Sequence, residues 1–307
     1  MRSINNIFFI GLGAIGAKYA SMFYDVNPDS VFVVVDHKRK SKYSTEGVFV
    51  NSKKYDFSYV TIPEDTKYAD LIILAVKSTD LIEALESIQP FVQENTMIIS
   101  LMNGISTADI VNDFFGRNVA LYSIVYMDAV KKGNQITYGH AGKLIFGEKT
   151  NILKTARVEE LCELFDRFGI TYEVPKDMLL SLWRKFLINV VGNQLTFVLN
   201  VGYEGLQDNP YVLSLVQEVG HEVIKIANAQ GIGLQQTDID DMIKTMRMLP
   251  GKAMTSMHQD RVNNRISEVD IFAGEMIRLG QKLNISTPYN LMLYNLIKAH
   301  EWERDSR

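Results

Sequence analysis

Three glycines near the start of the chain, Gly11, Gly13 and Gly16, stand in a G-x-G-x-x-G arrangement. They follow a short apolar run and lead into a helical sequence that includes Ala14 and Ile15. In a strand–turn–helix setting the first glycine permits a tight turn, the second lets the backbone approach a pyrophosphate, and the third lets the helix pack on the strand. The helix N-terminus then faces the phosphates, so the pattern predicts a dinucleotide site.

An acidic residue, Asp36, follows the second strand-like segment, twenty positions after Gly16. A carboxylate at this place accepts hydrogen bonds from the ribose diol of NAD(H). The basic run His37–Lys40 comes next, and a cation there could pair with the additional 2′-phosphate of NADP(H). The same run would also suit a solvated loop. We therefore expect a nicotinamide dinucleotide, either NAD(H) or NADP(H).

A polar stripe lies in the otherwise apolar segment 181–196, where Lys185, Asn189 and Asn193 are spaced by four. This spacing puts an ammonium group and two amides on one face of a helix. The polar groups of such a stripe on a mostly apolar helix must be hydrogen-bonded or exposed to water. A cleft satisfies both demands, although a narrow solvent-facing stripe on a surface helix would have the same pattern.

Further polar residues follow in the sequence, at Ser256 and around Glu268. Ser267 and Asp270 have the spacing of a capping box, which would place Glu268 in the first turn of a new helix. The helix dipole stabilises a carboxylate there, so Glu268 taken alone needs no ligand to explain it. The neighbouring polar positions favour a functional role.

Lys77 and Asn103 each come directly after an apolar, strand-like segment. Ligands of open α/β sheets bind outside the carboxyl ends of the strands, so both residues are expected near a nicotinamide or a substrate carboxylate. Polar residues that only shape loops would give the same sequence.

The elements that must position these residues alternate through the first half of the chain. Strands are expected at 7–10, 31–35, 71–76 and 97–101, and helices near 14–24, 80–91 and 107–115. This alternation predicts an α/β fold with a Rossmann-type, doubly wound sheet. Residues 119–130 and 143–146 have no crossover helix between them and are expected to form an antiparallel edge.

The pattern becomes almost purely helical after a helix at 157–168 and a short strand at 171–174. We therefore expect a dinucleotide-binding domain at residues 1–174 and an all-helical substrate or dimerisation domain at residues 175–307. Ser286 and Thr287 should cap a terminal helix that begins at Pro288.

Composition limits the class of protein. The chain has 307 residues, enough for two domains, and its net charge of -4 gives no basic footprint for nucleic acid. Cys162 is the only cysteine, which excludes an intrachain disulfide. Neither a signal peptide nor a membrane span is indicated, and the histidines lack metal-ligand spacing. A cytoplasmic protein without a metal is expected.

Taken in order, the segments GLGAIG, VKSTD, SLMNG, SLWRKFLINVVGN and SMHQDRVNNRISEVD resemble the ketopantoate reductase (2-dehydropantoate 2-reductase) family over nearly the whole chain. The glycine motif is shared by many dinucleotide-binding proteins. The triplet Lys185, Asn189 and Asn193, followed at these spacings by Ser256, Asp260 and Glu268, is more particular. The resemblance implies NADP(H)-dependent reduction of a small 2-oxo acid, with a possible homodimer.

The resemblance also implies roles for single residues. Lys185 would be the catalytic lysine that supplies a proton or positive charge to the ketone oxygen, and Glu268 would hold the substrate hydroxyl. An ammonium beside a developing alkoxide stabilises charge that is present mainly in the transition state. Asn189, Asn193 and Ser256 would hydrogen-bond the substrate. Asn103 would help to place Lys185 and the nicotinamide, and Lys77 would lie near the cofactor phosphates or ribose.

The sequence departs from the pattern of that family at three positions. Gln194 stands in place of a proline, Tyr203 in place of an asparagine, and Ala273 in place of another asparagine. Asp36 also occupies about the place of a basic residue that favours NADPH. Two alternatives therefore stay open: a related hydroxyacid dehydrogenase with another substrate, or a nucleotide-binding protein without catalysis.

Overall fold

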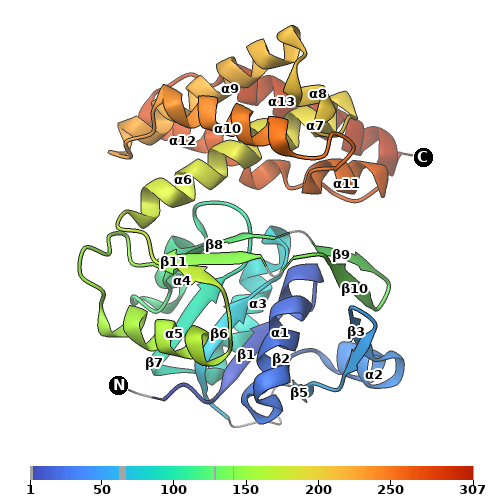
Figure 1. The fold of residues 1–307 in the computed structure, drawn as a ribbon, viewed down its shortest axis with the longest axis vertical. Helices are drawn as coiled ribbons and strands as arrows, with labels where there is room; N and C mark the ends of the chain where they lie inside the picture. The colour runs from blue at the N-terminus through green and yellow to red at the C-terminus, as the bar shows by residue number, and fades with distance from the viewer. Residues whose placement is uncertain (1–2, 62–66, 128, 141, 307) are drawn as a thin grey trace. The chain divides into compact units, whose positions relative to one another are not determined.

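The computed structural model describes residues 3–61, 67–127, 129–140 and 142–306. The chain divides into two compact units, Met1–Met178 and Leu179–Arg307 (Figure 1). The sequence pattern changes slightly earlier, at Pro175. Strands and helices alternate in the first unit, and the described part of the second unit is helical.

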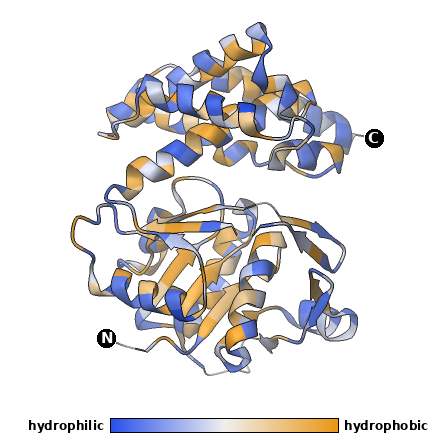
Figure 2. Ribbon diagram, in the orientation of Figure 1, coloured by the Kyte–Doolittle hydropathy of each residue, from blue (hydrophilic) through white to orange (hydrophobic). Residues whose placement is uncertain are grey.

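A five-stranded parallel sheet forms the centre of the first unit, with strand order β5-β2-β1-β6-β7. Ile7 of β1 is level with Val31 of β2 on one side and with Leu71 of β6 on the other. A parallel sheet is buried on both faces, which explains the nearly continuous apolar strands, orange in Figure 2. The strands are β1 (Ile7–Ile10), β2 (Val31–Val34), β5 (Ser58–Val60), β6 (Ala69–Leu74) and β7 (Val92–Ser100).

The strand order reverses between β1 and β6, so the carboxyl ends of these two strands mark the place where ligands of such sheets bind. The sheet and the helices between its strands confirm the predicted Rossmann-type α/β fold class. The helices of this unit are α1 (Ala14–Val26), α2 (His37–Glu46), α3 (Leu81–Ile88), α4 (Thr107–Phe115) and α5 (Ala156–Arg167).

Two smaller sheets complete the first unit. One has the order β12-β11-β8, from β8 (Tyr122–Tyr126), β11 (Lys143–Gly147) and β12 (Tyr172–Glu173). The other has the order β4-β3-β10-β9, from β3 (Val48–Val50), β4 (Lys53–Tyr55), β9 (Ala129–Lys132) and β10 (Gln135–Tyr138). The first of these sheets contains the antiparallel pair of β8 and β11 that the sequence predicted.

The strand-like segment 119–130 is divided between two sheets. β8 ends at Tyr126, and β9 belongs to the other small sheet because it pairs with β10 in a hairpin. The two residues between these strands are Gly133 and Asn134, and Gly133 has φ +61. A two-residue hairpin turn requires this left-handed conformation, which glycine adopts readily.

The second unit consists of helices of very different length (Figure 1). They are α6 (Met178–Ile188), which begins at the last residue of the first unit, α7 (Gln194–Leu199), α8 (Glu204–Gln207), α9 (Pro210–Ala229), α10 (Gln236–Met248), α11 (Ser256–Val262), α12 (Ala273–Leu283) and α13 (Pro288–Asp305). A π-helical turn, Asn189–Asn193, connects α6 to α7 without a loop. The apolar segment around the predicted polar stripe is therefore one continuous rod.

The terminal helix begins at Pro288 with Thr287 as its N-cap residue, as predicted, but its first N–H groups are satisfied by another side chain. Within the described chain the Thr287 side chain makes no capping hydrogen bond. The Glu222 carboxylate of α9 accepts from the backbone N–H groups of Tyr289 and Asn290, at 2.8 and 3.0 Å. The negative carboxylate is attracted to the positive end of the α13 dipole, so Glu222 links α9 to α13.

Candidate active site

The glycine turn follows β1 and is shaped by the end of β6 beside it. Gly11 has φ +94, and a Cβ there would lie 2.4 Å from the carbonyl O of Ala75. A Cβ on Gly16 would lie 2.0 Å from the carbonyl O of Gly11. Gly13 is different, because the nearest atom to its Cβ would be Ala75 O at 3.8 Å. Packing demands glycine at the first and third positions, whereas the second leaves room for a ligand.

The first helix begins directly after this turn, with Ala14 and Ile15 as its first two residues. Gly13 is the N-cap residue, and the first turn of α1 has neither a side-chain cap nor an acidic residue within the described chain. The first backbone N–H groups of a helix need acceptors from outside the helix, and a phosphate supplies them. The turn therefore fits a pyrophosphate.

Asp36 lies two residues beyond the end of β2 and is the N-cap of α2. Its Oδ1 accepts from the backbone N–H of Arg39 at 2.6 Å, and its Oδ2 lies 3.6 Å from Nη1 of the same arginine. The basic run His37–Lys40 forms the first turn of α2 rather than a loop. An acidic and a basic group thus share the start of one helix beside the glycine turn.

Lys77 and Asn103 follow the carboxyl ends of β6 and β7, which are neighbours in the parallel sheet. Lys77 is exposed, and Asn103 is half-buried. Gly104, the next residue, has φ +101 and turns the chain toward α4. Because β1 and β6 are also neighbours, both residues come from the sheet edge that carries the glycine turn.

Lys185, Asn189 and Asn193 lie along the rod formed by α6, the π-helical turn and α7. Asn189 and Asn193 are the first and last residues of the π-helical turn, which their spacing did not predict. Both are buried, and Asn193 Nδ2 donates to Asn189 Oδ1 at 3.4 Å. Single π-helical turns inside helices are frequent at functional sites, so this geometry adds an independent reason to place a site here.

The Lys185 side chain is half-buried rather than immersed in bulk water. Burial lowers the pKa of its ammonium group from the usual 10.5 to about 8. A lysine with this pKa exchanges its proton close to physiological pH, as a general acid or base must. Lys185 can therefore release or take up a proton close to physiological pH.

A buried polar network next to the asparagines was not foreseen from the sequence. The fully buried Gln194 donates from Nε2 to the carbonyl O of Val190 at 2.6 Å and lies 3.3 Å from Asn290 Oδ1. Asn290 Nδ2 donates to Glu222 Oε2 at 2.8 Å. In an α-helix the backbone N–H of Gln194 would bond Val190 O, so the side chain replaces a bond that the π-helical turn disrupts.

Ser256 is the first residue of α11 and is exposed. The helix is capped by Thr255, whose Oγ1 accepts from the backbone N–H of His258 at 3.2 Å. The Thr255 hydroxyl also lies 2.6 Å from that of Thr196 on α7, which fixes the start of α11 against the rod. Ser256 is thereby held at the surface, at the start of α11.

The expected capping box around Glu268 is not formed. Asp270 bonds α13 instead, accepting from Tyr294 Oη at 2.9 Å and from Lys298 Nζ at 2.7 Å. Glu268 precedes a single 3₁₀ turn, Val269–Ile271, and is half-buried. The next α-helix starts only at Ala273, so Glu268 lies in a tight connection rather than in a first helical turn.

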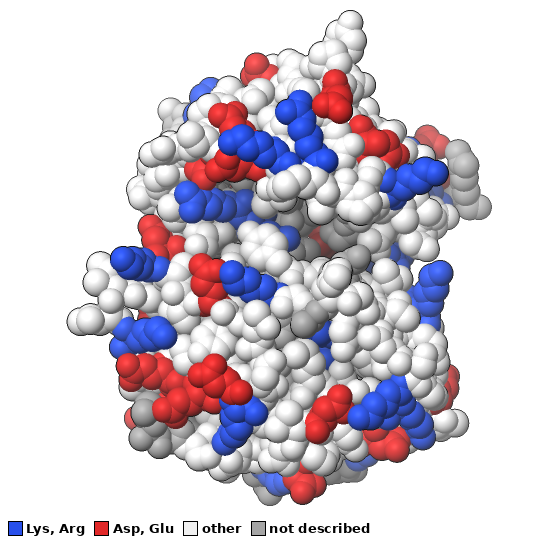
Figure 3. Space-filling model, in the orientation of Figure 1, with Lys and Arg blue, Asp and Glu red and all other residues white. Residues whose placement is uncertain are grey.

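The remaining surface gives little sign of another chemistry. Lys and Arg side chains are interspersed with Asp and Glu on the face shown in Figure 3. The described residues contain no group of three or more His, Cys, Asp or Glu that could hold a metal ion. In the same part of the chain, no helix combines the length and apolarity that crossing a bilayer would require.

Two family models match the chain. The model described as ketopantoate reductase PanE/ApbA matches residues 7–151, and its C-terminal counterpart matches residues 177–301. The chain belongs to the ketopantoate reductase family. The predicted resemblance is confirmed, and with it the prediction of an oxidoreductase of this family.

Relatives of this family align with almost the whole chain. A protein of Pyrococcus horikoshii named 2-dehydropantoate 2-reductase is 29% identical over 300 residues, with 96% of this chain and 97% of the relative covered. The Streptococcus pyogenes protein of the same name is 23% identical over 299 residues, with the same coverage of both chains.

Solved structures support the same fold. D-mandelate dehydrogenase, in a ternary complex with NADH and anilino(oxo)acetate, has a TM-score of 0.87 at 24% identity, with 98% of this chain and 99% of that chain covered. The PanE/ApbA family ketopantoate reductase from Ralstonia eutropha has a TM-score of 0.84 at 23% identity and the same coverage. At these identities the likeness extends to the fold alone.

Proposed function

We propose that this chain reduces the ketone of a small 2-oxo acid to the 2-hydroxy acid, with 2-dehydropantoate as the substrate and pantoate as the product. The observation that carries the proposal is Lys185, a half-buried lysine with a pKa lowered to about 8, one helical turn before a buried pair of asparagines. The family supplies the reaction class, and Lys185 supplies a group that can perform its proton transfer.

The cofactor of this proposal is NADP(H), with NAD(H) as the alternative because of Asp36. The glycine turn fits either form, since Gly13 leaves space where a pyrophosphate would pass. When bound, the nicotinamide supplies the hydride. The first domain, residues 1–174, would hold the dinucleotide, with Lys77 and Asn103 near its ribose and nicotinamide. The second domain, residues 175–307, would bind the substrate.

The proton transfer is assigned to Lys185. Its ammonium group would give a proton to the ketone oxygen as that oxygen gains negative charge, which is stabilisation realised mainly in the transition state. Asn189, Asn193 and Ser256 would hydrogen-bond the substrate, and the Glu268 carboxylate would accept from its hydroxyl group. Removing the ammonium group should then slow turnover without weakening dinucleotide binding.

The substitution Lys185→Ala tests this function. We expect turnover of 2-dehydropantoate with NADPH or NADH to fall at least about a hundredfold, while dinucleotide affinity measured by calorimetry stays within about threefold of the wild-type value. The matched control is Arg184→Ala on the same turn of α6, whose side chain is exposed and pairs with Asp238 at 2.7 Å. A Lys185→Ala variant as active as the Arg184→Ala control would refute the proposal.

A second candidate is a hydroxyacid dehydrogenase for another substrate. Gln194, Tyr203 and Ala273 favour it, because these residues depart from the family pattern and Gln194 directly follows Asn193. A turnover panel of 2-oxo acids that includes 2-dehydropantoate and an aromatic 2-oxo acid separates the two. Tight dinucleotide binding without turnover of any member of the panel would instead indicate a nucleotide-binding protein without catalysis.

We also propose a homodimer and a cytoplasmic location. The dimeric ketopantoate reductase from Staphylococcus aureus has the same fold, with a TM-score of 0.80. The second unit of this chain exposes apolar side chains of α13 that a partner could cover, namely Leu291, Met292 and Leu296. Light scattering of the purified protein tests the dimer, because a mass near 34.8 kDa would show a monomer.

A further inference from the structure

A lysine from a distant part of the chain reaches the glycine turn. Lys131 lies on β9, and its Nζ donates to the carbonyl O of Leu12 at 2.6 Å, across 119 positions of sequence. Helix α1 packs against both β9 and β10, which brings this hairpin alongside the turn. Lys131 is half-buried there, whereas its neighbour Lys132 is exposed.

The contact orients the turn itself. Leu12 stands between the first two glycines of the motif, and its carbonyl belongs to the peptide unit that carries the N–H of Gly13. In a planar trans peptide the C=O and the following N–H point in opposite directions. Fixing Leu12 O toward Lys131 therefore fixes the Gly13 N–H on the opposite side.

Lys131 also faces the helix that begins at Asp36. Its Nζ lies 6.0 Å from the centre of the Tyr43 ring on α2. Burial first, and then the charges of Lys42 and Arg39, lower the pKa of Lys131. Lys131 thus lies between the glycine turn and α2, where Arg39 precedes Tyr43 by one helical turn and Lys42 is the residue next to it.

Of these three cations, Lys131 is the one without a carboxylate partner among the described residues. Arg39 lies 3.6 Å from Asp36, and Lys42 lies 4.0 Å from Glu46 on the exposed side of α2. An ammonium group has three N–H donors, and in the described part of the chain Lys131 has one hydrogen-bond acceptor, Leu12 O. Lys131 is half-buried, whereas Arg39 and Lys42 are exposed, and an anion bound among these like charges would stabilise all three.

The adenosine ribose of a dinucleotide binds in a Rossmann fold between the glycine turn and the residue that follows the second strand. Lys131 hydrogen-bonds the glycine turn and lies near Tyr43 of α2, the helix that begins after Asp36. The anion that distinguishes one dinucleotide from the other at this ribose is the 2′-phosphate, a doubly charged monoester that Lys and Arg bind well. The carboxylate of Asp36 is meanwhile engaged by the backbone and guanidinium of Arg39.

We propose that Lys131, together with Arg39 and Lys42, forms the recognition site for the ribose 2′-phosphate and makes this chain prefer NADP(H) to NAD(H) in spite of Asp36. Lys131 is then a specificity-determining residue supplied by the β9–β10 hairpin, outside the segment that follows β2. The proposal rests on the proposed function for the identity of the dinucleotide, but its test needs no turnover.

The test compares two fragments of the cofactor, 2′,5′-ADP and 5′-AMP, by calorimetry on the full-length protein. We expect the wild-type chain to bind 2′,5′-ADP at least about tenfold more tightly than 5′-AMP. In Lys131→Met this ratio should fall by about tenfold, through loss of affinity for 2′,5′-ADP alone. The matched control Lys132→Met, on the neighbouring exposed residue, should keep the wild-type ratio.

Three outcomes overturn the proposal. The first is a wild-type chain that binds both fragments equally. The second is a Lys131→Met variant that binds both fragments more weakly to the same degree, which would leave Lys131 only the role of fixing Leu12 O. The third is the same ratio of the two affinities in Lys131→Met and Lys132→Met. Thermal melting checks that each variant is folded, and Lys131→Gln, which keeps a donor, replaces Lys131→Met if that variant does not fold. A chain that shows the expected ratio but reduces no 2-oxo acid would refute the proposed function alone.

Discussion

The side-chain amide of Asn193 donates to that of Asn189, with 3.4 Å between Nδ2 and Oδ1, across a π-helical turn that begins at one residue and ends at the other. Both amides are buried in the second unit. The hydrogen bond fixes the orientation of the two side chains relative to each other, which a pair that recognises a substrate requires. Whatever holds the π-helical turn therefore holds the geometry of the pair.

Gln194 is the residue that we expect to hold this turn. In Gln194→Met the carbonyl O of Val190 loses the side-chain donor at 2.6 Å, at a site with no exposure to solvent. Leaving a buried acceptor unsatisfied costs about 1–3 kcal/mol of unfolding free energy. If the turn also relaxes, KM for the 2-oxo acid should rise more than kcat falls. Urea unfolding and steady-state kinetics measure the two effects.

The control for this prediction is Gln230→Met. Gln230 also donates to the carbonyl four residues earlier, Ile226 O, but at 3.5 Å and at the end of α9. Loss of the Gln230 hydrogen bond should leave both the free energy of unfolding and the KM close to the wild-type values. A Gln194→Met variant with reduced stability but an unchanged KM would show that Gln194 is structural only.

Lys185 predicts the pH dependence of the reaction. Its pKa is lowered to about 8 by burial, so the ammonium form is present below this pH and is lost above it. If the ammonium group is the acid, kcat/KM for ketone reduction should fall about tenfold per pH unit above about 8. The reverse oxidation needs the neutral amine and should rise as the pH approaches 8. Initial rates from pH 6.5 to 10 in both directions measure this.

The variant Lys185→Arg serves as the control for this profile. A guanidinium group keeps its charge from pH 6.5 to 10. The fall in kcat/KM above about pH 8 should therefore disappear in this variant, whatever its remaining rate. If wild-type reduction were independent of pH between 7 and 10, Lys185 would not be the group that gives the proton.

Two glycine substitutions separate packing from ligand contact in the turn. Gly16→Ala places a Cβ 2.0 Å from Gly11 O, so we expect a large loss of stability. Gly13→Ala meets its first neighbour, Ala75 O, at 3.8 Å and should melt close to the wild-type temperature. The same Cβ should nevertheless obstruct the pyrophosphate and weaken NADPH binding at least about tenfold. Calorimetric titration and thermal melting distinguish these results, and full NADPH affinity in folded Gly13→Ala would contradict the proposed phosphate site.

The sequence predicted the parts of this molecule that depend on local patterns. Strands β1 and β2 are continuous apolar runs, β6 and β7 contain the buried apolar segments 71–74 and 97–99, and the glycine turn joins β1 to α1 as expected. The π-helical turn could not be predicted in this way, because α- and π-helical turns differ in hydrogen bonding rather than in the hydrophobic pattern. A buried glutamine inside an apolar helix was the available signal.

Long-range contacts account for the other differences. Lys131 and Leu12, or Glu222 and Tyr289, are far apart in sequence, and no periodicity links such residues. The hairpin strand β9 was misread because it is short and carries two lysines, whereas strand signals depend on alternating apolar residues. Sequence patterns thus gave the frame of the proposed site, and tertiary contacts supplied the groups that tune it.

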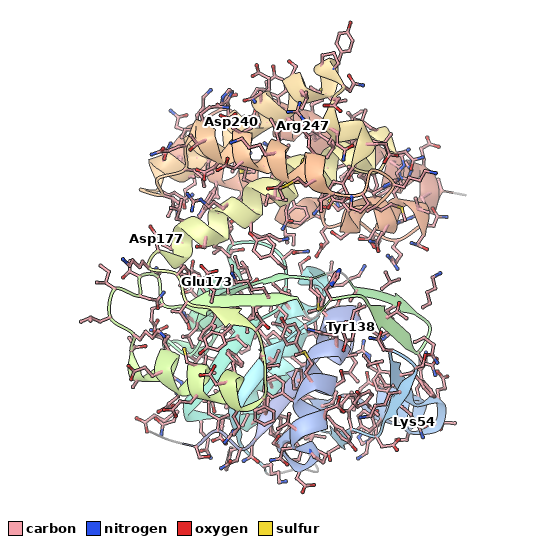
Figure 4. The ribbon with its side chains drawn as sticks, viewed as in Figure 1. Lys54, Tyr138, Glu173, Asp177, Asp240 and Arg247 are labelled. Atoms are coloured by element: carbon pink, nitrogen blue, oxygen red, sulfur yellow. The ribbon has the colours of Figure 1, made fainter. Side chains whose placement is uncertain are left out.

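Lys18 on α1 gives a prediction about stability. Its side chain is fully buried, with Nζ 4.4 Å from the centre of the Tyr19 ring and 5.4 Å from that of Tyr138, the β10 residue labelled in Figure 4. Burial lowers its pKa from 10.5 to about 8, so the folded chain binds this proton less tightly than the unfolded chain. The resulting loss of folding stability is complete below pH 8 and disappears above pH 10.5.

Lys18→Met should therefore stabilise the protein at pH 7. We expect a gain of about 3 kcal/mol at most, because the substitution also removes the contacts of the ammonium group with the two rings. The gain should shrink as the pH rises from 8 to 10.5. Urea unfolding at pH 7, 9 and 10.5 measures it, with the exposed Lys132→Met as the control. A Lys18→Met variant less stable than the wild type at pH 7 would mean that contacts of the buried ammonium outweigh its loss of hydration.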